Sequence, residues 1–351
     1  MSFSQEELKQ YNRHFILEDI GETGQLKLKQ AKVLIIGAGG LGCPVLQYLT
    51  AAGIGNIGIL DDDIIEQSNL QRQILYTYND IGKHKAAVAA SKLALLNPFV
   101  NLKAHTERLT NKNAISLFDK YDIIVDGSDN FSTRYLVNDA AVITNKPVVF
   151  GSIYKFEGQV SVFNYRNGPN YRCLFPTPPD SKLVGNCSAI GVLGVLPGII
   201  GALQANEVIK IICQIGNILS GKLWTINTLT MDQHLLNFKK NSAILINKLE
   251  DNYFNFCGAQ ENLKEIKYCE LIKHMSEYNL LDVRTINERN KYHIGGIHIP
   301  LNELPEKFNT IPQSKNLIVY CQSGIRSKEA ITFLKKAGFT CALFNLEGGL
   351  N

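Results

Sequence analysis

Short apolar runs alternate with helix-like segments over the first 150 residues of the chain. Apolar runs rich in Val and Ile predict strands, and segments with a three-to-four-residue apolar spacing predict helices. The predicted strands cover 32–37, 56–60, 100–105, 122–126 and 146–150, and the predicted helices cover 41–53, 82–96 and 111–119. Strands that alternate with helices indicate βαβ units, so we expect a Rossmann-like, mostly parallel sheet with helices on both faces.

The pattern changes after residue 150 and again after residue 230. Alternating strands at 157–164 and 223–229 predict an antiparallel extension of the sheet, and a proline-rich loop at 165–187 lies between them. A second, smaller α/β unit follows, with helices predicted at 268–276 and 325–337 and strands at 279–283, 317–320 and 341–345. We therefore predict a first domain over 1–240, a linker over 241–264 and a second domain over 265–351.

One uncharged stretch, residues 187–206, is nearly long enough to span a membrane. It contains Pro197 and four glycines, and it continues into Glu207 and Lys210. A buried helix of an α/β domain explains this composition better than a membrane span does. The polar N-terminal segment does not resemble a secretory signal. We expect a cytoplasmic protein that does not bind a membrane.

Composition and charge narrow the function classes. Apolar residues make up 45% and charged residues 19% of the 351-residue chain, which suffices for a sizeable core. Lys and Arg number 36 against 32 for Asp and Glu, and a net charge of +4 is too small for a dedicated nucleic-acid binder. The eight cysteines contain no close pair, so we expect reduced thiols.

A glycine-rich turn follows the first predicted strand. Gly37, Gly39 and Gly42 form a G-x-G-x-x-G pattern, with Gly40 also inside it, and the pattern opens a predicted helix. Glycines there allow a phosphate to approach the backbone at a helix N-terminus. Asp61 ends the next strand, where a carboxylate can accept from ribose hydroxyls. An NAD(P) dehydrogenase shares these features.

Charged residues beyond the turn favour a triphosphate over a dinucleotide. Arg72 and Lys85 supply the positive charge that separating phosphate oxygens need. Asp129, after another strand, can hold Mg²⁺ through oxygen. The carboxyl ends of parallel strands share one edge of a sheet, so these side chains are expected to meet there.

At this point the first 240 residues resemble the MoeB/ThiF/HesA family, bacterial relatives of the ubiquitin-activating enzymes. The motifs that carry the resemblance are YNRH (11–14), GAGGLGC (37–43), LDDD (60–63), SNLQRQ (68–73), KHKA (83–86), GSDN (127–130), YRC (171–173) and the segment 186–210. The resemblance implies ATP-dependent adenylation of the C-terminal glycine of a ubiquitin-like sulfur carrier. It also implies a homodimer in which Arg13 reaches the partner subunit's ATP. Within one subunit, the nucleotide-binding residues would be Gly37, Gly39, Gly40, Gly42, Asp61, Ser68, Asn69, Leu70, Gln71, Arg72, Lys85, Asp129 and Asn130.

The chain departs from that family at its zinc site. Family members usually carry two C-x-x-C pairs, whereas here Cys173 and Cys257 keep only the second cysteine of each pair. Tetrahedral zinc needs four nitrogen or sulfur ligands, and two thiolates without a nearby histidine make a poor site. We predict that the protein binds no zinc.

Two cysteines are candidate nucleophiles. Cys187 precedes an apolar, glycine-rich helix, whose N-terminus would favour its thiolate, although a buried structural thiol remains the alternative. Its position matches a cysteine that, in relatives, accepts the activated carrier or forms an acyl disulfide. Cys321 begins the loop CQSGIRS between a strand and a helix, where backbone N–H groups and Arg326 would surround an anion. A phosphatase loop is built in the same way.

The second domain resembles a rhodanese. The loop at 321–326, the segments LLDVRT (280–285) and HIGGIHIPL (293–301), and the final NLEGG (345–349) carry this resemblance. The combination resembles fused adenylyltransferase–rhodanese proteins of the MOCS3/Uba4 type. It implies that a persulfide on Cys321, loaded by a cysteine desulfurase or another donor, supplies sulfur to the adenylated carrier. We favour the molybdopterin pathway, with thiamine or tRNA-thiolation carriers as alternatives. A non-catalytic docking protein for a ubiquitin-like partner is the alternative outside enzymes.

Overall fold

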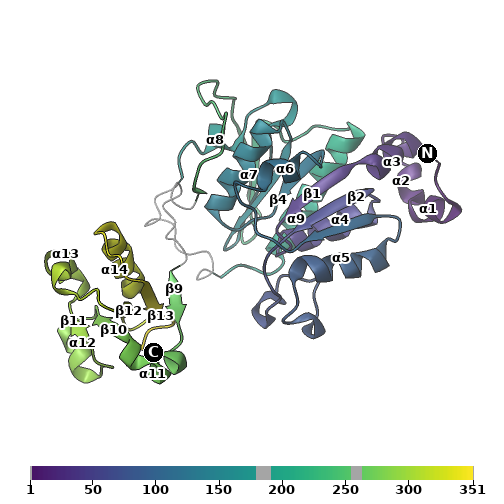
Figure 1. The fold of residues 1–351 in the computed structure, drawn as a ribbon. Coiled ribbons are helices and arrows are strands. Elements are labelled where there is room, and N and C mark those ends of the chain that lie inside the picture. Colours follow the sequence, from purple (N-terminus) through teal and green to yellow (C-terminus); the bar gives the residue numbers. More distant parts are fainter. Residues whose placement is uncertain (1, 179–190, 254–262, 351) are drawn as a thin grey trace. The chain divides into compact units, whose positions relative to one another are not determined.

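The computed structural model describes residues 2–178, 191–253 and 263–350, and it divides into two compact units, 1–259 and 260–351 (Figure 1). The strands of unit 1 are β1 (Lys32–Ile36), β2 (Asn56–Leu60), β3 (Asn101–His105), β4 (Ile123–Asp126), β5 (Val148–Tyr154), β6 (Glu157–Phe163), β7 (Lys222–Asn227) and β8 (Gln233–Asn237). Its helices are α1 (Gln5–Gln10), α2 (Asn12–Phe15), α3 (Gly21–Gln30), α4 (Gly42–Ala51), α5 (Lys85–Leu96), α6 (Ala114–Phe118), α7 (Phe131–Ile143), α8 (Tyr171–Leu174) and α9 (Leu196–Cys213), with short 3₁₀ turns η1 (Gln67–Asn69), η2 (Tyr78–Asp80) and η3 (Tyr165–Asn167).

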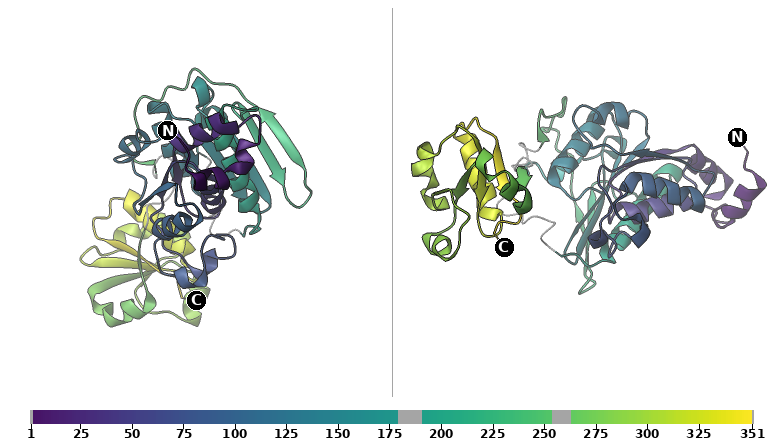
Figure 2. Two further views of the ribbon diagram at one scale, coloured as in Figure 1. Left: turned by 90° about the vertical axis from the view of Figure 1, so that its right-hand side faces the viewer. Right: turned by 60° about the horizontal axis from the view of Figure 1, so that its bottom comes forward.

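The eight strands of unit 1 form one sheet in the order β3-β2-β1-β4-β5-β6-β7-β8. The strands from β3 to β5 pair in parallel, and β6, β7 and β8 continue the sheet antiparallel. This confirms the predicted mostly parallel sheet with an antiparallel extension. Figure 2 shows the same sheet from two further sides, with helices on both faces.

Alternate residues of β1 enter two separate cores, as a strand covered on both faces requires. Val33 and Ile35 belong to the core shared with α4, α5 and α9. Leu34 and Ile36 belong to the opposite core, with α6 and α7. The continuous apolar run in the sequence therefore reflects burial on both faces of the sheet.

Helix α9 contains most of the described part of the uncharged stretch. Among the described residues it is the one helix long and apolar enough to cross a membrane, but it packs against β5, β6 and α4. The buried Gln204 amide joins it to the sheet by donating to the carbonyls of Asp126 (2.8 Å) and Val149 (3.2 Å). Its surroundings are those of a core helix.

Unit 2 is a five-stranded parallel sheet in the order β11-β10-β12-β13-β9. Its strands are β9 (Lys264–Ile266), β10 (Tyr278–Asp282), β11 (Ile297–His298), β12 (Asn316–Tyr320) and β13 (Leu343–Leu346). Its helices are α11 (Tyr268–Lys273), α12 (Ile286–Lys291), α13 (Leu304–Lys307) and α14 (Ile325–Lys336), with 3₁₀ turns η5 (Met275–Glu277), η6 (Leu301–Glu303) and η7 (Phe308–Thr310). This confirms the smaller α/β domain that the sequence predicts.

The segment predicted as a linker over 241–264 differs from that description in its first half. Tyr253 is buried and donates its hydroxyl to Asp139 on α7 (2.7 Å). The Asn111 amide donates to the carbonyls of Glu250 (3.3 Å) and Asp251 (2.9 Å). Residues 241–253 therefore belong to unit 1, where side-chain contacts hold them.

Candidate active sites

Unit 1 contains a cavity of about 690 Å³ at the carboxyl ends of its central strands. The residues predicted for the nucleotide that line it are Gly37, Gly39, Gly40, Asp61, Ser68, Asn69, Gln71, Arg72, Lys85, Asp129 and Asn130. They come from the ends of three strands, from the segment around η1 and, for Lys85, from the first residue of α5. The parallel topology thus brings together residues that lie up to 93 positions apart in the sequence.

The glycine-rich turn forms one wall of this cavity. Gly37 has a φ of +92°, which favours glycine, and its N–H donates to the Leu60 carbonyl at 2.8 Å. A Cβ on Gly42 would lie 1.9 Å from the Gly37 oxygen, so the start of α4 can approach the turn only without a side chain. Gly42 itself stands behind the turn and does not line the cavity.

Asp61 follows β2 and holds the glycine-rich turn by hydrogen bonds. Its carboxylate accepts from the N–H groups of Ala38 (2.7 Å) and Asp63 (2.9 Å). Burial nevertheless raises the pKa of Asp61, because these contacts and the charge of Lys85 offset only part of the desolvation. An acceptor of this kind can bind the hydroxyl groups of a ribose.

Both predicted cations, Lys85 and Arg72, line the cavity. The Lys85 side chain is only 7% exposed, and its Nζ lies 2.8 Å from the carboxylate of Asp63, which is 68% exposed. Arg72 donates from Nη1 to the Ser68 carbonyl (3.2 Å). Both positive charges therefore sit beside the glycine-rich turn, where they can neutralise phosphate oxygens.

The turn after β4 presents Asp129 and Asn130 to the cavity. Asn130 caps α7, its side chain accepting from the Thr133 N–H (2.9 Å) and the Ser132 hydroxyl (2.8 Å). Asp129 is exposed to the cavity at this point. A single carboxylate suits Mg²⁺, which binds proteins through one or two carboxylates and otherwise takes phosphate and water oxygens.

Sequence reasoning missed Arg134, which supports that turn. The buried Arg134 guanidinium donates to the Ser128 carbonyl (3.3 Å) and stacks near Phe131 and Phe150. Ser128 also donates from its N–H and hydroxyl to the buried Asp126 (2.9 and 2.6 Å). The available signal was the spacing of Arg134 one helical turn after the cap Asn130.

Two further predicted nucleotide residues, besides Gly42, do not line the cavity. Leu70 packs against the hydrophobic core, and it does not line the cavity. Arg13, on α2, is exposed and does not line the cavity of its own subunit. Its role at a partner subunit's nucleotide stays a prediction. The cavity also includes Glu107, Arg108, Tyr154 and Lys155, which the sequence did not single out.

Unit 2 places Cys321 in the loop between β12 and α14. The thiol is fully buried, its sulfur lying 3.4 Å from the Ser327 N–H and 3.3 Å from the Ser327 hydroxyl. Burial alone would raise the pKa of Cys321, but hydrogen bonds from Ser327 and from the backbone of Ser323 and Gly324 lower it. The loop is a nest of N–H groups around one sulfur atom.

Arg326 lies in this loop but is engaged by another helix. Its Nη1 and Nη2 donate to the two oxygens of Glu288 (2.8 and 2.5 Å). Glu288 belongs to α12, where it also accepts from the N–H and hydroxyl of Thr285 in a capping box. The charge expected to surround an anion is thus shared with a carboxylate, which the sequence pattern did not reveal.

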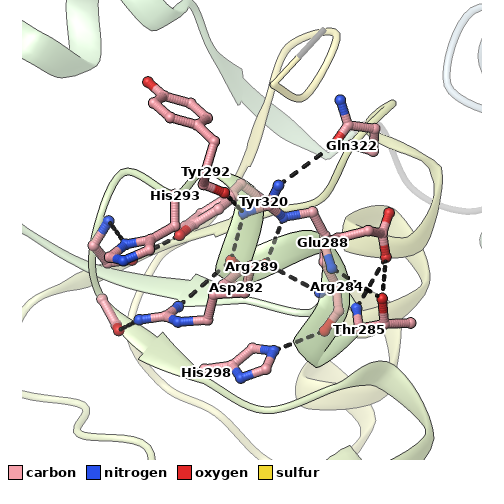
Figure 3. Close-up of polar contacts among 12 residues, drawn as sticks. Asp282, Arg284, Thr285, Glu288, Arg289, Tyr292, His293, His298, Tyr320 and Gln322 are labelled. Carbon is pink, nitrogen blue, oxygen red and sulfur yellow. Dashed lines mark hydrogen bonds and ion pairs between the residues drawn. The ribbon is translucent and has the colours of Figure 1, made fainter.

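A buried ion pair braces the loop from the β10 side (Figure 3). Arg284 donates to both oxygens of Asp282 (3.0 and 2.8 Å), and both side chains are almost inaccessible. Arg284 also donates to the Tyr292 carbonyl (2.8 Å) and the Gln322 side chain (3.4 Å). A second cation, Arg289, lies 3.4 Å from Asp282.

The remaining sequence predictions concern cysteines. Cys187 and Cys257 lie outside the described residues. Cys173 is half-buried and accepts from the Asn241 N–H at 3.4 Å. In the described parts of the chain no group of three or more His, Cys, Asp or Glu side chains could hold a metal. The absence of zinc remains a prediction.

These two sites define the class of the protein: a nucleotide-binding α/β domain with cations facing its phosphate turn, joined to an α/β domain with a thiol in an N–H nest. Comparison with known sequences gives the family. The ThiF family model matches residues 11–244, and the rhodanese-like domain model matches residues 268–351. The chain belongs to the ThiF family and carries a C-terminal rhodanese-like domain.

Two relatives match this chain over nearly their whole length. A Mycobacterium tuberculosis protein named "Probable adenylyltransferase/sulfurtransferase MoeZ" is 41% identical over 368 residues, covering 99% of this chain and 93% of the relative. A Porphyra purpurea protein named "Probable molybdopterin-synthase adenylyltransferase" is 40% identical over 360 residues, covering 100% and 94%. Among solved structures, one of E. coli MccB with MccA has a TM-score of 0.60 at 26% identity, covering 68% of this chain and 74% of that one.

Proposed function

We propose that this protein is an adenylyltransferase that uses ATP to activate the C-terminal Gly-Gly carboxylate of a ubiquitin-like sulfur carrier, and that its rhodanese domain supports thiocarboxylation. The pathway we propose is molybdopterin synthesis in the cytoplasm. The observation that carries the proposal is the convergence of Arg72, Lys85, Asp61 and Asp129 on one cavity beside a glycine turn. The names of the relatives support both activities.

Adenylation follows from the charges that line the cavity. A carrier carboxylate oxygen attacks the α-phosphorus of ATP, the bond to the bridging oxygen breaks, and pyrophosphate leaves. Lys85 and Arg72 neutralise the oxygens on which charge grows during this displacement. Asp61 accepts from the ribose, and the N–H groups of the turn bind phosphate. Bound Mg²⁺, held by Asp129, would supply further charge neutralisation on the phosphates.

Arg13 completes the proposed site in a homodimer. It is exposed on α2 and does not line the cavity of its own subunit, so a second subunit is where its charge would be used. A mixed dimer tests this. One subunit carries Arg13→Ala and the other Lys85→Ala, so one of the two cavities keeps both cations. Activity recovered on mixing the two inactive variants supports the dimer.

Sulfur transfer is assigned to Cys321. A donor such as a cysteine desulfurase first transfers a sulfane sulfur to the thiolate, which gives a persulfide. The outer sulfur then attacks the acyl carbon of the adenylate, AMP leaves, and an acyl disulfide forms. A thiol must cleave that S–S bond to release the thiocarboxylate, and a thiol reductant must then reopen the disulfide left on Cys321. Cys187 stays our prediction for a cysteine that forms a covalent intermediate with the carrier.

ATP–pyrophosphate exchange with each candidate carrier is the decisive assay. The matched control is the same carrier without its last glycine. Exchange that depends on one intact carrier would establish acyl adenylation and identify the pathway. Exchange with a thiamine or tRNA-thiolation carrier alone would replace molybdopterin in the proposal. No exchange with any carrier, from protein shown to be folded, would contradict the enzymatic function of unit 1 and favour a docking protein.

A further inference from the structure

A chain of hydrogen bonds leads away from the Cys321 thiol through the interior of unit 2. Its sulfur lies 3.3 Å from the Ser327 hydroxyl, which lies 2.6 Å from the side-chain oxygen of Asn345 on β13. The Asn345 amide nitrogen lies 3.0 Å from a carboxylate oxygen of Glu265 on β9. Cys321, Ser327 and Asn345 are fully buried. Helix α14 and strands β13 and β9 thus each contribute one side chain to a row of hydrogen bonds that begins at the sulfur.

The donors and acceptors in this line follow from Glu265. Its carboxylate lies 2.8 Å from the Lys328 ammonium, and the hydrogen bond from Lys328 lowers the pKa of Glu265, so the carboxylate only accepts. Asn345 therefore turns its NH₂ group toward Glu265 and its oxygen toward Ser327. Because an amide oxygen also only accepts, the single proton of the Ser327 hydroxyl points at Asn345.

This arrangement leaves a lone pair of Ser327 facing the sulfur. The Ser327 oxygen can accept the proton of a Cys321 thiol, but it can donate to a thiolate only after its bond to Asn345 breaks. The Ser327 N–H, at 3.4 Å, stays directed at the sulfur, and the backbone of Ser323 and Gly324 also donates to it. The hydroxyl contributes to the lowered pKa of Cys321 only in the other orientation, with its proton directed at the sulfur.

The geometry points to Asn345, oriented by Glu265, as a positioning residue that turns the Ser327 hydroxyl proton away from Cys321, so that this hydroxyl does not stabilise the thiolate of the unloaded cysteine. This inference rests on the proposed role of Cys321 as the sulfur acceptor. It adds a restraint to that role: one hydrogen bond that would favour the reactive thiolate is withheld from the empty site.

The charged side chains around the loop are held in ion pairs. The hydrogen bonds from Ser327 through Asn345 to Glu265 are therefore the contacts that can change the environment of the sulfur. Arg326 on α14 pairs with Glu288 on α12, and Arg284 pairs with Asp282 on β10, which Arg289 also contacts. Lys328 on α14 pairs with Glu265 on β9. His298 on β11 bonds to the main-chain oxygen of Arg284 (2.8 Å).

The test measures the rate of alkylation of Cys321 by iodoacetamide between pH 5 and 10, followed by mass spectrometry of the peptide that contains it. The full-length protein is used without carrier or sulfur donor, so the result is independent of adenylation and persulfide chemistry. Asn345→Leu removes the acceptor and keeps the branched shape and the number of side-chain heavy atoms. Since one hydrogen bond is redirected to the thiolate, we expect about three- to tenfold more thiolate at a given pH, which moves the midpoint down by about 0.5–1 pH unit.

A second pair of variants separates this role from a general effect on packing. In a Ser327→Ala background, Asn345→Leu should leave the midpoint unchanged, because there is no hydroxyl proton to redirect. An equal shift in both backgrounds, or no downward shift in the single variant, would overturn the inference.

Glu265→Gln keeps the proposal testable if Asn345→Leu fails to fold. Position 265 is partly exposed, and a glutamine there allows the Asn345 amide to flip, so that its NH₂ group faces Ser327. We therefore expect a smaller downward shift of the Cys321 alkylation midpoint. Glu270→Gln, on the exposed side of α11, is the matched control and should leave the midpoint in place. A Glu265→Gln midpoint equal to that of the control would also count against the inference.

Discussion

The buried carboxylates at the sheet edge of unit 1 and the carboxylates around the thiol loop of unit 2 differ in the direction of their pKa shifts. In unit 1, burial raises the pKa of Asp61 and of Asp126, and their positive neighbours offset only part of it. In unit 2, the hydrogen bond from Arg326 lowers the pKa of Glu288, and the bonds from Arg284 outweigh burial and lower that of Asp282. Unit 2 satisfies its own charges, whereas the cavity of unit 1 is built around charges that a bound molecule would complete.

The two sites differ in how completely they are formed before a ligand binds. The N–H nest of Cys321 is braced by arginine–carboxylate pairs that exist before any substrate arrives. Leu350 donates its N–H to the carbonyls of Cys321 and Gln322 (3.1 Å each), and a Cβ on Gly349 would lie 2.5 Å from the latter oxygen. The floor of the loop is therefore close-packed backbone. The unit 1 cavity has a preformed glycine turn, but Asp63 and Asp129 beside it remain exposed.

The largest expected effect tests whether the two sites are chemically separate. Cys321→Ala should abolish sulfur transfer from a persulfide donor, because no other described group combines a buried thiol with an N–H nest. ATP–pyrophosphate exchange should stay at the wild-type rate. Cys269→Ala, which removes an exposed thiol, is the control and should retain both activities. Loss of exchange in Cys321→Ala would show that the sites are not separable.

The converse substitution acts on unit 1. Lys85→Ala should slow ATP–pyrophosphate exchange by about 10²–10³-fold, since one group that stabilises developing phosphate charge is removed. Sulfur transfer from thiosulfate to cyanide should be unchanged. Lys83→Ala is a matched control, because that side chain is 61% exposed and contacts Asp80 only at 4.0 Å. If Lys83→Ala slowed exchange as much as Lys85→Ala does, Lys85 would have no special role.

Ligand addition should stabilise one unit and leave the other unchanged. MgATP at a hundred times its dissociation constant should stabilise unit 1 against unfolding by about 2.7 kcal/mol. Thiosulfate should change unit 2 much less, because its ion pairs are already formed. Hydrogen exchange read peptide by peptide distinguishes the units. Equal protection of both units by MgATP would contradict the contrast between them.

The smallest expected effect is the loss of stability of unit 2 at low pH. A carboxylate with a lowered folded-state pKa contributes stability that is fully present above the ordinary glutamate value of about 4.3 and is lost as pH falls through the folded value. Unit 2 should therefore lose stability below pH about 4.3, and Glu288→Gln should lack that part of the loss, worth less than about 1 kcal/mol for a partly exposed pair. Hydrogen exchange of unit 2 between pH 3 and 6 measures it, and Glu303→Gln, in a surface pair with Lys307, is the comparison.

The sequence predicted the elements whose burial leaves a recognisable pattern of apolar residues. The strands that became β1, β2, β4 and β12 are continuous apolar runs, because both faces of each are covered, and all were placed within two residues. Strand β8 (Gln233–Asn237) was missed because every one of its residues is exposed, so its sequence carries no burial pattern. Strand β9 has three residues and one buried position, too few for any period.

The candidate sites divide in the same way. Residues at strand ends, such as Asp61 and Asp129, could be predicted because parallel strands share an edge. Arg134 and Arg284 were not singled out, since their value depends on partners that only the fold brings near. The contact between Arg326 and Glu288 joins residues 38 positions apart, and no local sequence pattern predicts it.

The contact between Tyr253 and Asp139 has a consequence for the order of synthesis. Asp139 is buried and receives this hydroxyl from a residue made 114 positions later. At 5–20 residues per second, roughly 6–23 s pass between the two on a translating ribosome. During that interval α7 must fold around a carboxylate that lacks one of its partners. The nascent first domain should therefore complete its packing only as the chain begins to enter the second.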